Sequence, residues 1–139
     1  MAAQITNVRG PKRTVLKHLE QLRFKDAETL LRTGIPERRN GAIYLAGYGV
    51  ECALKAKICV DRGDYQLDSK FFHHDLVRLA TETCKWKLMS LKKDAWYGRL
   101  FYLQTMWFVE MRYEVRSHDK EKVRQFIEKA KEFTKWLSE

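Results

Sequence analysis

The sequence predicts an all-α protein folded as an up-and-down bundle of about five helices. Apolar residues recur at three- and four-residue steps along most of the chain, which is the spacing of one helix face. Only two prolines and seven glycines punctuate 139 residues, too few for the dense turns of a sandwich or barrel. Because one hydrophobic core usually serves about 100 to 200 residues, we expect a single domain.

The N-terminal part divides into an arm and a first helix. Residues 1–13 place basic side chains around Gly10-Pro11, which predicts a loosely held basic arm before a helical domain over residues 14–139. The first helix should run from Thr14 to about Leu31, with a kink or an interruption near residues 24–26. It should end at the Gly34–Pro36 stop signal.

The segment from Asn40 to Asp61 predicts the central helix, with Asn40 as its N-cap. Five of its residues form one apolar stripe with a small residue inside it. They are Ile43, Gly47, Val50, Leu54 and Ile58. A second stripe, offset by about a quarter turn, combines two tyrosines with a charged pair. Its members are Tyr44, Tyr48, Glu51 and Lys55.

Three further helices complete the predicted bundle. One should open at His73–Asp75 and reach about Cys84, before a basic connector with Lys85, Lys87, Lys92 and Lys93. A long aromatic helix should cover Asp94–Val115, and an amphipathic helix should cover Asp119–Leu137. Short connections favour antiparallel neighbours in such a bundle.

Charge and cysteine content limit the classes of function. Lys and Arg total 27 against 18 acidic residues, so the net charge of +9 attracts polyanions, although the same charge could serve only solubility. Three cysteines without CxxC spacing predict buried, reduced thiols and no zinc site. Adjacent histidines at 73 and 74 point about 100° apart on a helix, which favours capping and exposure over metal binding. Without a long apolar run, we expect a cytoplasmic protein that needs neither a membrane nor a cofactor.

Several motifs occur together in a characteristic order. Small and aromatic residues precede a Glu-x-x-x-Lys pair in the segment Ala42–Ala56. The other elements are Ala-x-x-Leu-Leu at Ala27–Leu31, His-x-Leu at His74–Leu76, and Trp…Arg-Tyr at Trp107–Tyr113. From about residue 14 onward the chain resembles a HEPN domain (higher eukaryotes and prokaryotes nucleotide-binding domain). This resemblance implies a helical bundle that usually dimerises, and that binds nucleotides or acts as a metal-independent ribonuclease in toxin-antitoxin or defence systems.

In the ribonuclease branch of this family, an Arg is commonly followed by a polar residue, spacers and a His. Here Arg112 and His118 have five residues between them, with Tyr113 where the polar residue is usual. The resemblance implies that His118 takes the proton of a ribose 2′-hydroxyl and that Arg112 holds the phosphorane charge. On an ideal helix the two side chains diverge, so the helix must bend or stop before His118, where Ser117 or Asp119 could cap the next helix.

Each candidate site also has a structural interpretation. His118 could be exposed in a turn, with Arg112 and Arg116 as solvated surface. Glu51 and Lys55 could be an ordinary i,i+4 ion pair beside packing tyrosines, an interpretation we favour by its frequency in helical bundles. In the functional interpretation, the stripe of Tyr44, Tyr48, Glu51 and Lys55 forms a cleft wall beside Arg112, where tyrosines stack a base and Lys55 meets phosphate. Tyr113 and Arg116 would then contribute to RNA or nucleotide binding.

Two functional hypotheses and a third explanation follow. The first is a homodimeric endoribonuclease restrained by an antitoxin partner. The second is a non-catalytic module that binds nucleotide or RNA or docks on a partner such as a nucleotidyltransferase. Tyr113, in place of the usual polar residue, favours this second hypothesis. The third is an unrelated basic bundle.

Overall fold

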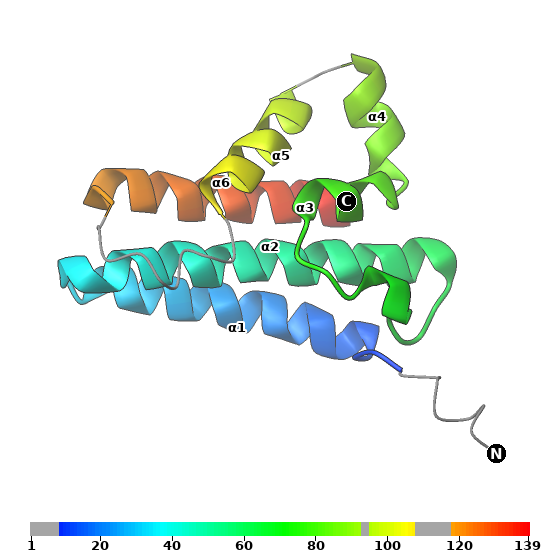
Figure 1. Cartoon of the computed structure of the whole chain (residues 1–139), viewed down its shortest axis with the longest axis horizontal. Helices are drawn as coiled ribbons and strands as arrows, with labels where there is room; N and C mark the ends of the chain where they lie inside the picture. The colour runs from blue at the N-terminus through cyan, green and yellow to red at the C-terminus, as the bar shows by residue number, and fades with distance from the viewer. Residues whose placement is uncertain (1–8, 93–94, 108–117) are drawn as a thin grey trace.

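The computed structural model describes residues 9–92, 95–107 and 118–139, and the regular elements in these ranges are helical (Figure 1). The described ranges contain six α-helices: α1 Arg13–Arg32, α2 Arg39–Arg62, α3 Leu76–Thr81, α4 Lys85–Lys92, α5 Ala95–Met106 and α6 Lys120–Ser138. Two short 3₁₀ turns, η2 Pro36–Arg38 and η3 Ser69–Phe71, lie in the connections. The predicted all-α class is therefore confirmed.

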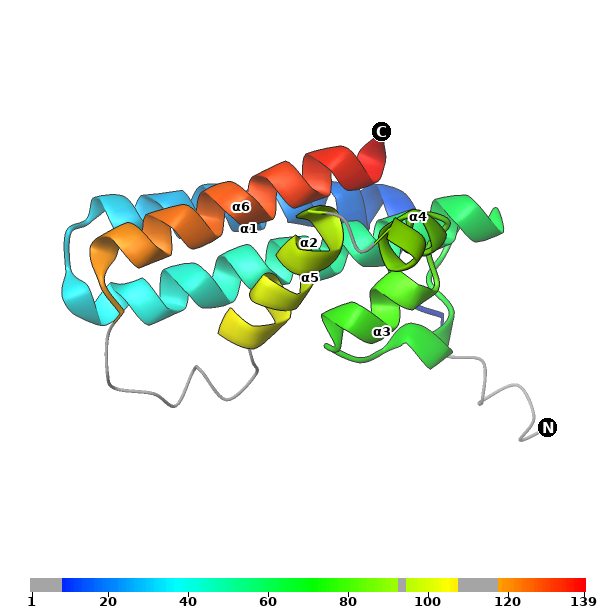
Figure 2. The same ribbon diagram turned by 90° about the horizontal axis from the view of Figure 1, so that it is seen from above.

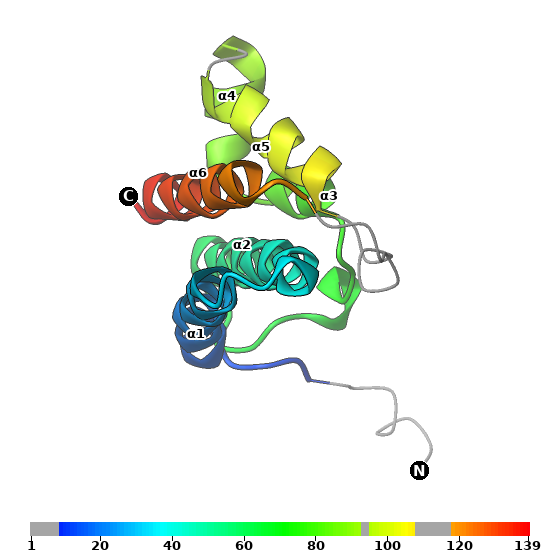
Figure 3. The same cartoon turned by 90° about the vertical axis from the view of Figure 1, so that its left-hand side faces the viewer.

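The three long helices form the body of the molecule, with α2 between α1 and α6 (Figure 3). Helix α1 runs antiparallel to α2, as the short connection between them predicts. Helices α2 and α6 run in the same direction, because the chain returns through α3, α4 and α5 before it enters α6 (Figures 1 and 2). Helices α4 and α5 project from this three-helix body.

The interior position of α2 follows from its small residues. Ile43, Val50, Leu54 and Ile58 of the predicted stripe are at most 1% exposed. At Gly47 a Cβ atom would lie 2.1 Å from the Trp107 ring, and at Gly49 it would lie 3.1 Å from the Phe24 ring. Two aromatic rings therefore contact the backbone of α2 directly, which a larger residue would prevent.

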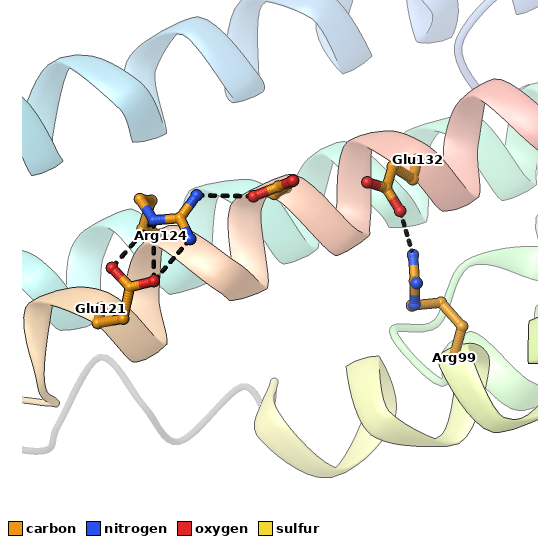
Figure 4. Close-up of polar contacts among 5 residues, drawn as sticks. Arg99, Glu121, Arg124 and Glu132 are labelled. Atoms are coloured by element: carbon orange, nitrogen blue, oxygen red, sulfur yellow. Dashed lines mark hydrogen bonds and ion pairs between the residues drawn. The ribbon is translucent and has the colours of Figure 1, made fainter.

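Aromatic and charged contacts attach the projecting helices to α6. The rings of Trp96 and Trp136 stack at 4.9 Å, and Lys85 Nζ lies 4.7 Å from the Trp136 centroid. Arg99 Nη1 donates to Glu132 Oε2 at 3.0 Å (Figure 4). The inward residues predicted for the last helix are buried as expected: Val123, Phe126, Ile127, Ala130, Phe133 and Leu137.

Two predictions for the N-terminal part are wrong. Helix α1 continues through residues 24–26, because buried Phe24 and Ala27 keep one face of the helix on α2. Residues 10–13 are not loosely held. Gly10 N and Arg13 N donate to Leu67 O and Tyr65 O, at 3.1 and 3.0 Å, and Leu67 N donates to Pro11 O at 3.0 Å.

Three helix boundaries also differ from the prediction. Asn40 is buried inside α2, which begins at Arg39 directly after η2, so it is not the N-cap. Residues 85–92 of the predicted basic connector form helix α4, which is separated from α3 near Cys84, whose N donates to Asp61 Oδ2 at 2.8 Å. Cys84 is exposed, so the prediction of buried thiols is wrong for this cysteine. Helix α5 ends at Met106, and Trp107 after it is anchored on α2; residues 108–115 of the predicted helix lie outside the described residues.

We expect Gly47→Ala to destabilise the protein by about 1–3 kcal/mol or more, because the added methyl would overlap the Trp107 ring in a close-packed core. Urea unfolding followed by circular dichroism measures the change. Gly98→Ala is the matched control, since a Cβ at Gly98 in α5 meets nothing within 4 Å and alanine is the better helix former by about 0.5–1 kcal/mol. Equal unfolding midpoints for the two variants would contradict the proposed contact.

Candidate functional site

A groove of about 380 Å³ lies along α1 and α2 beneath the segment that connects α2 to α3. We call it the α1–α2 groove. Its lining residues are Pro11, Leu16, Leu19, Tyr48, Glu51, Cys52, Lys55, Leu67, Phe72 and His74. Apolar side chains from α1 and the connection form one side, and polar side chains of α2 together with His74 form the other. Grooves of this size and mixed character are typical of small-ligand sites.

The polar end of the groove is centred on Glu51, whose residue exposure is only 2%. Its Oε2 accepts a hydrogen bond from Lys55 Nζ at 2.9 Å, and its Oε1 is 2.7 Å from His74 Nδ1. The predicted i,i+4 pair therefore exists, but it is buried rather than a surface pair. A carboxylate in this position is stable only because both of its oxygens are hydrogen-bonded and Lys55 balances its charge.

His74 is held in place by the start of helix α3. Asp75 Oδ1 accepts from Arg78 N at 3.0 Å and so caps this helix, as the sequence predicts. Gln104 Oε1 of α5 accepts from Leu76 N and Val77 N at 2.8 and 3.2 Å. Because these bonds fix the backbone next to His74, its ring is directed to Glu51 while its side chain stays 47% exposed.

The sequence did not identify His74 as a site residue. The signal in the sequence that could have identified it is Glu51 on a helix predicted to be buried. Lys55 can satisfy one of its oxygens, and the other needs a partner from another element.

The two predicted tyrosines have different roles. Tyr48 lines the groove, with its ring centroid 6.2 Å from that of His74, and burial raises the pKa of its hydroxyl. Tyr44 is not among the lining residues; its carbonyl accepts from Trp107 Nε1 at 3.0 Å and its ring lies 6.2 Å from Trp107. Tyr44 is therefore a packing residue, and Tyr48 is the tyrosine within reach of a ligand in the groove.

The N-terminal arm supplies one wall of the groove. Pro11 lines the groove, and backbone hydrogen bonds hold residues 10–13 against residues 65–67 of the connection between α2 and α3. A Cβ at Gly10 would lie 2.5 Å from Leu67 O and 2.7 Å from the Phe72 ring. The close approach at Gly10 thus sets the position of Phe72 at the rim.

The groove offers little for nucleophilic or metal chemistry. Burial raises the pKa of the Cys52 thiol to about 12, so it stays protonated and unreactive near neutral pH. In the part of the chain that the structure describes, no three His, Cys, Asp or Glu side chains are arranged to hold a metal ion.

Of the second candidate site, His118 is the residue that the structure describes, and it lies away from the groove. Arg112, Tyr113 and Arg116 lie outside the described residues. His118 is half-buried just before α6; its carbonyl accepts from Arg39 Nη1 at 3.4 Å, and its Nε2 is buried with no hydrogen-bond partner within residues 9–92, 95–107 and 118–139. The twelve-residue offset between Arg39 and Glu51 is about 18 Å along α2. Tyr48, Glu51, Lys55 and His74 therefore form one group, and His118 lies apart from it.

Comparison with known families agrees with the fold. The family model of the HEPN domain matches residues 21–139, and the chain belongs to this family. Neither the search of curated proteins nor the search of solved structures found a match. None of the described helices is long and apolar enough to cross a membrane.

We expect Glu51→Leu alone to cost about 3–5 kcal/mol of stability, because it leaves the Lys55 charge buried and unpaired. Glu51→Leu with Lys55→Met should recover most of this loss, since a hydrophobic pair can replace a buried ion pair. Denaturant unfolding of the four proteins in a double-mutant cycle measures the coupling.

The exposed i,i+4 pair of Arg124 and Glu128 on α6, at 2.7 Å, is the matched control. Solvent screens this pair, so its coupling should be close to zero. Strictly additive effects at Glu51 and Lys55 would contradict the importance of the buried pair.

Proposed function

We propose that this HEPN domain binds RNA or a nucleotide in the α1–α2 groove. The observation that carries the proposal is the buried Glu51 carboxylate, which presents Lys55 and His74 together at the polar end of an otherwise apolar groove. A nucleotide has the same mixed character, with a flat base and a polar sugar. Tyr48 beside His74 and Phe72 on the apolar side supply aromatic surface in the groove.

The net charge of +9 supports the polyanionic form of the ligand. Cations on the surface increase the encounter rate with RNA and contribute a salt-dependent part of the affinity. The groove then adds contacts that depend on the nucleotide itself. A module of this kind needs no turnover, and it could act alone or docked on a partner such as a nucleotidyltransferase.

The test is a titration with a short fluorescent single-stranded RNA at low and high salt. Affinity should fall with salt, and His74→Ala should weaken binding about fivefold by removing one hydrogen-bonding group. His18→Ala is the matched control, because His18 is an exposed histidine of α1 that does not line the groove. Unchanged affinity in His74→Ala, with no RNA displaced by mononucleotides, would refute binding at this groove.

A second function, metal-independent RNA cleavage by Arg112 and His118, is favoured by one specific observation. His118 itself is not helical and lies just before α6, which begins at Lys120. Its buried Nε2, without a partner in the described ranges, is available for a role in proton transfer. In this proposal a homodimer would assemble the two side chains in a cleft, with Tyr113 and Arg116 beside them, and an antitoxin would restrain the enzyme.

For this second function, we expect the wild-type protein to cleave a test RNA in the presence of a metal chelator, and Arg112→Ala and His118→Ala each to abolish cleavage without lowering the melting temperature. Gel analysis of the RNA products and the oligomeric state from light scattering are the measurements. Persistent cleavage in both variants would exclude these residues as the catalytic pair.

A further inference from the structure

We propose, building on nucleotide binding in the α1–α2 groove, that the groove recognises the ribose of a ribonucleotide through a hydrogen bond to His74 Nε2, and that the phosphate stays outside. The inference rests on the charge balance at the polar end, on the hydrogen bond that fixes His74, and on the shape of the groove.

The charge balance excludes a strong phosphate site at the polar end. Among the lining residues that the structure describes, Lys55 is the only Lys or Arg, and its charge is neutralised by Glu51 at 2.9 Å. A phosphate placed near Lys55 would also meet the Glu51 carboxylate, which repels it. Lys55 is therefore not the phosphate contact that the sequence suggested, although its remaining N–H groups can still donate to a neutral oxygen.

Charges on the neighbouring helix do not alter this balance. On α1, Lys17 Nζ is 3.0 Å from Glu20 Oε1, and Arg23 Nη1 is 3.1 Å from Asp26 Oδ2. These cations are paired with acids of their own helix. A neutral polar group is therefore the ligand that the polar end fits best.

The bond to Glu51 determines what His74 offers to that ligand. An ionised carboxylate can only accept, so His74 Nδ1 carries the hydrogen of the 2.7 Å bond. In the neutral imidazole the other nitrogen, Nε2, is then an acceptor, and the 47% exposure of the side chain leaves it open to a ligand. It selects a group that donates a hydrogen bond, as a ribose hydroxyl does.

The apolar side of the groove defines the orientation of the nucleoside. Leu16, Leu19, Leu67 and Phe72 face the polar end across a space of about 380 Å³, which suits one base and its sugar rather than a length of polymer. With the base against this apolar side, the sugar lies beside His74. The wall held by residues 10–13 and 65–67 limits the groove on the arm side.

Uridine, 2′,3′-dideoxyuridine and uridine monophosphate, titrated at pH 8 by calorimetry, test the inference. Uridine and dideoxyuridine carry the same base and differ only in the 2′- and 3′-hydroxyls. A preference for uridine therefore reports contacts to these hydroxyls. We expect uridine to bind about five- to tenfold more tightly than dideoxyuridine, the effect of one hydrogen bond. The monophosphate should bind about as tightly as uridine, with little dependence on salt.

Variants and NMR assign the effect to His74. His74→Ala should bind uridine and dideoxyuridine equally, whereas His18→Ala should keep the preference. Histidine-selective ¹⁵N spectra should show a protonated Nδ1 and an unprotonated Nε2 in His74, with a shift of the Nε2 signal when uridine is added.

Equal affinity of the wild type for uridine and dideoxyuridine would overturn ribose recognition. So would much tighter, salt-dependent binding of the monophosphate than of uridine. Neither result would contradict RNA binding at the groove. The same holds if His74→Ala keeps the preference. Absence of binding by RNA and by all three compounds would overturn both this inference and the proposed function.

Discussion

The structure depends on the burial of α2 on almost every side. Close packing of this helix requires small residues, and the Trp107 and Phe24 rings contact its backbone at Gly47 and Gly49. These contacts link α2 to α1 and to the end of α5, two elements that are far apart in the sequence. Because the central helix has no broad face toward solvent, each polar side chain on it must find a partner inside the protein.

The need for buried polar partners is met at Glu51, in the candidate site. Its carboxylate is buried by the packing of α2, and its two oxygens are satisfied by Lys55 from the same helix and His74 from the next connection. The arrangement stabilises the fold and at the same time fixes one ring nitrogen of a partly exposed histidine. A structural role for Glu51 is therefore compatible with the ligand-binding role proposed for the groove, because the same contacts serve both.

His118 and the α1–α2 groove lie at different positions along α2. His118 lies near Arg39 at the start of the helix, whereas the α1–α2 groove lies beside Glu51, near its middle. Arg112 lies outside the described residues, so the cleft wall expected beside it stays a prediction. Membership of the family establishes the helical bundle, and the chemistry of each site follows from its own residues.

The sequence by itself determined the helical class, the buried faces of α2 and α6, and the pairing of Glu51 with Lys55. These properties depend on spacing along a helix, which is local. The burial of this pair, its third member His74, the wall that residues 10–13 form at the groove and the end of α5 at Met106 became evident in the folded structure alone. Each of these features requires contact between distant segments, such as Gly10 with Leu67 or Trp107 with Gly47, and no local pattern encodes which distant backbone will approach.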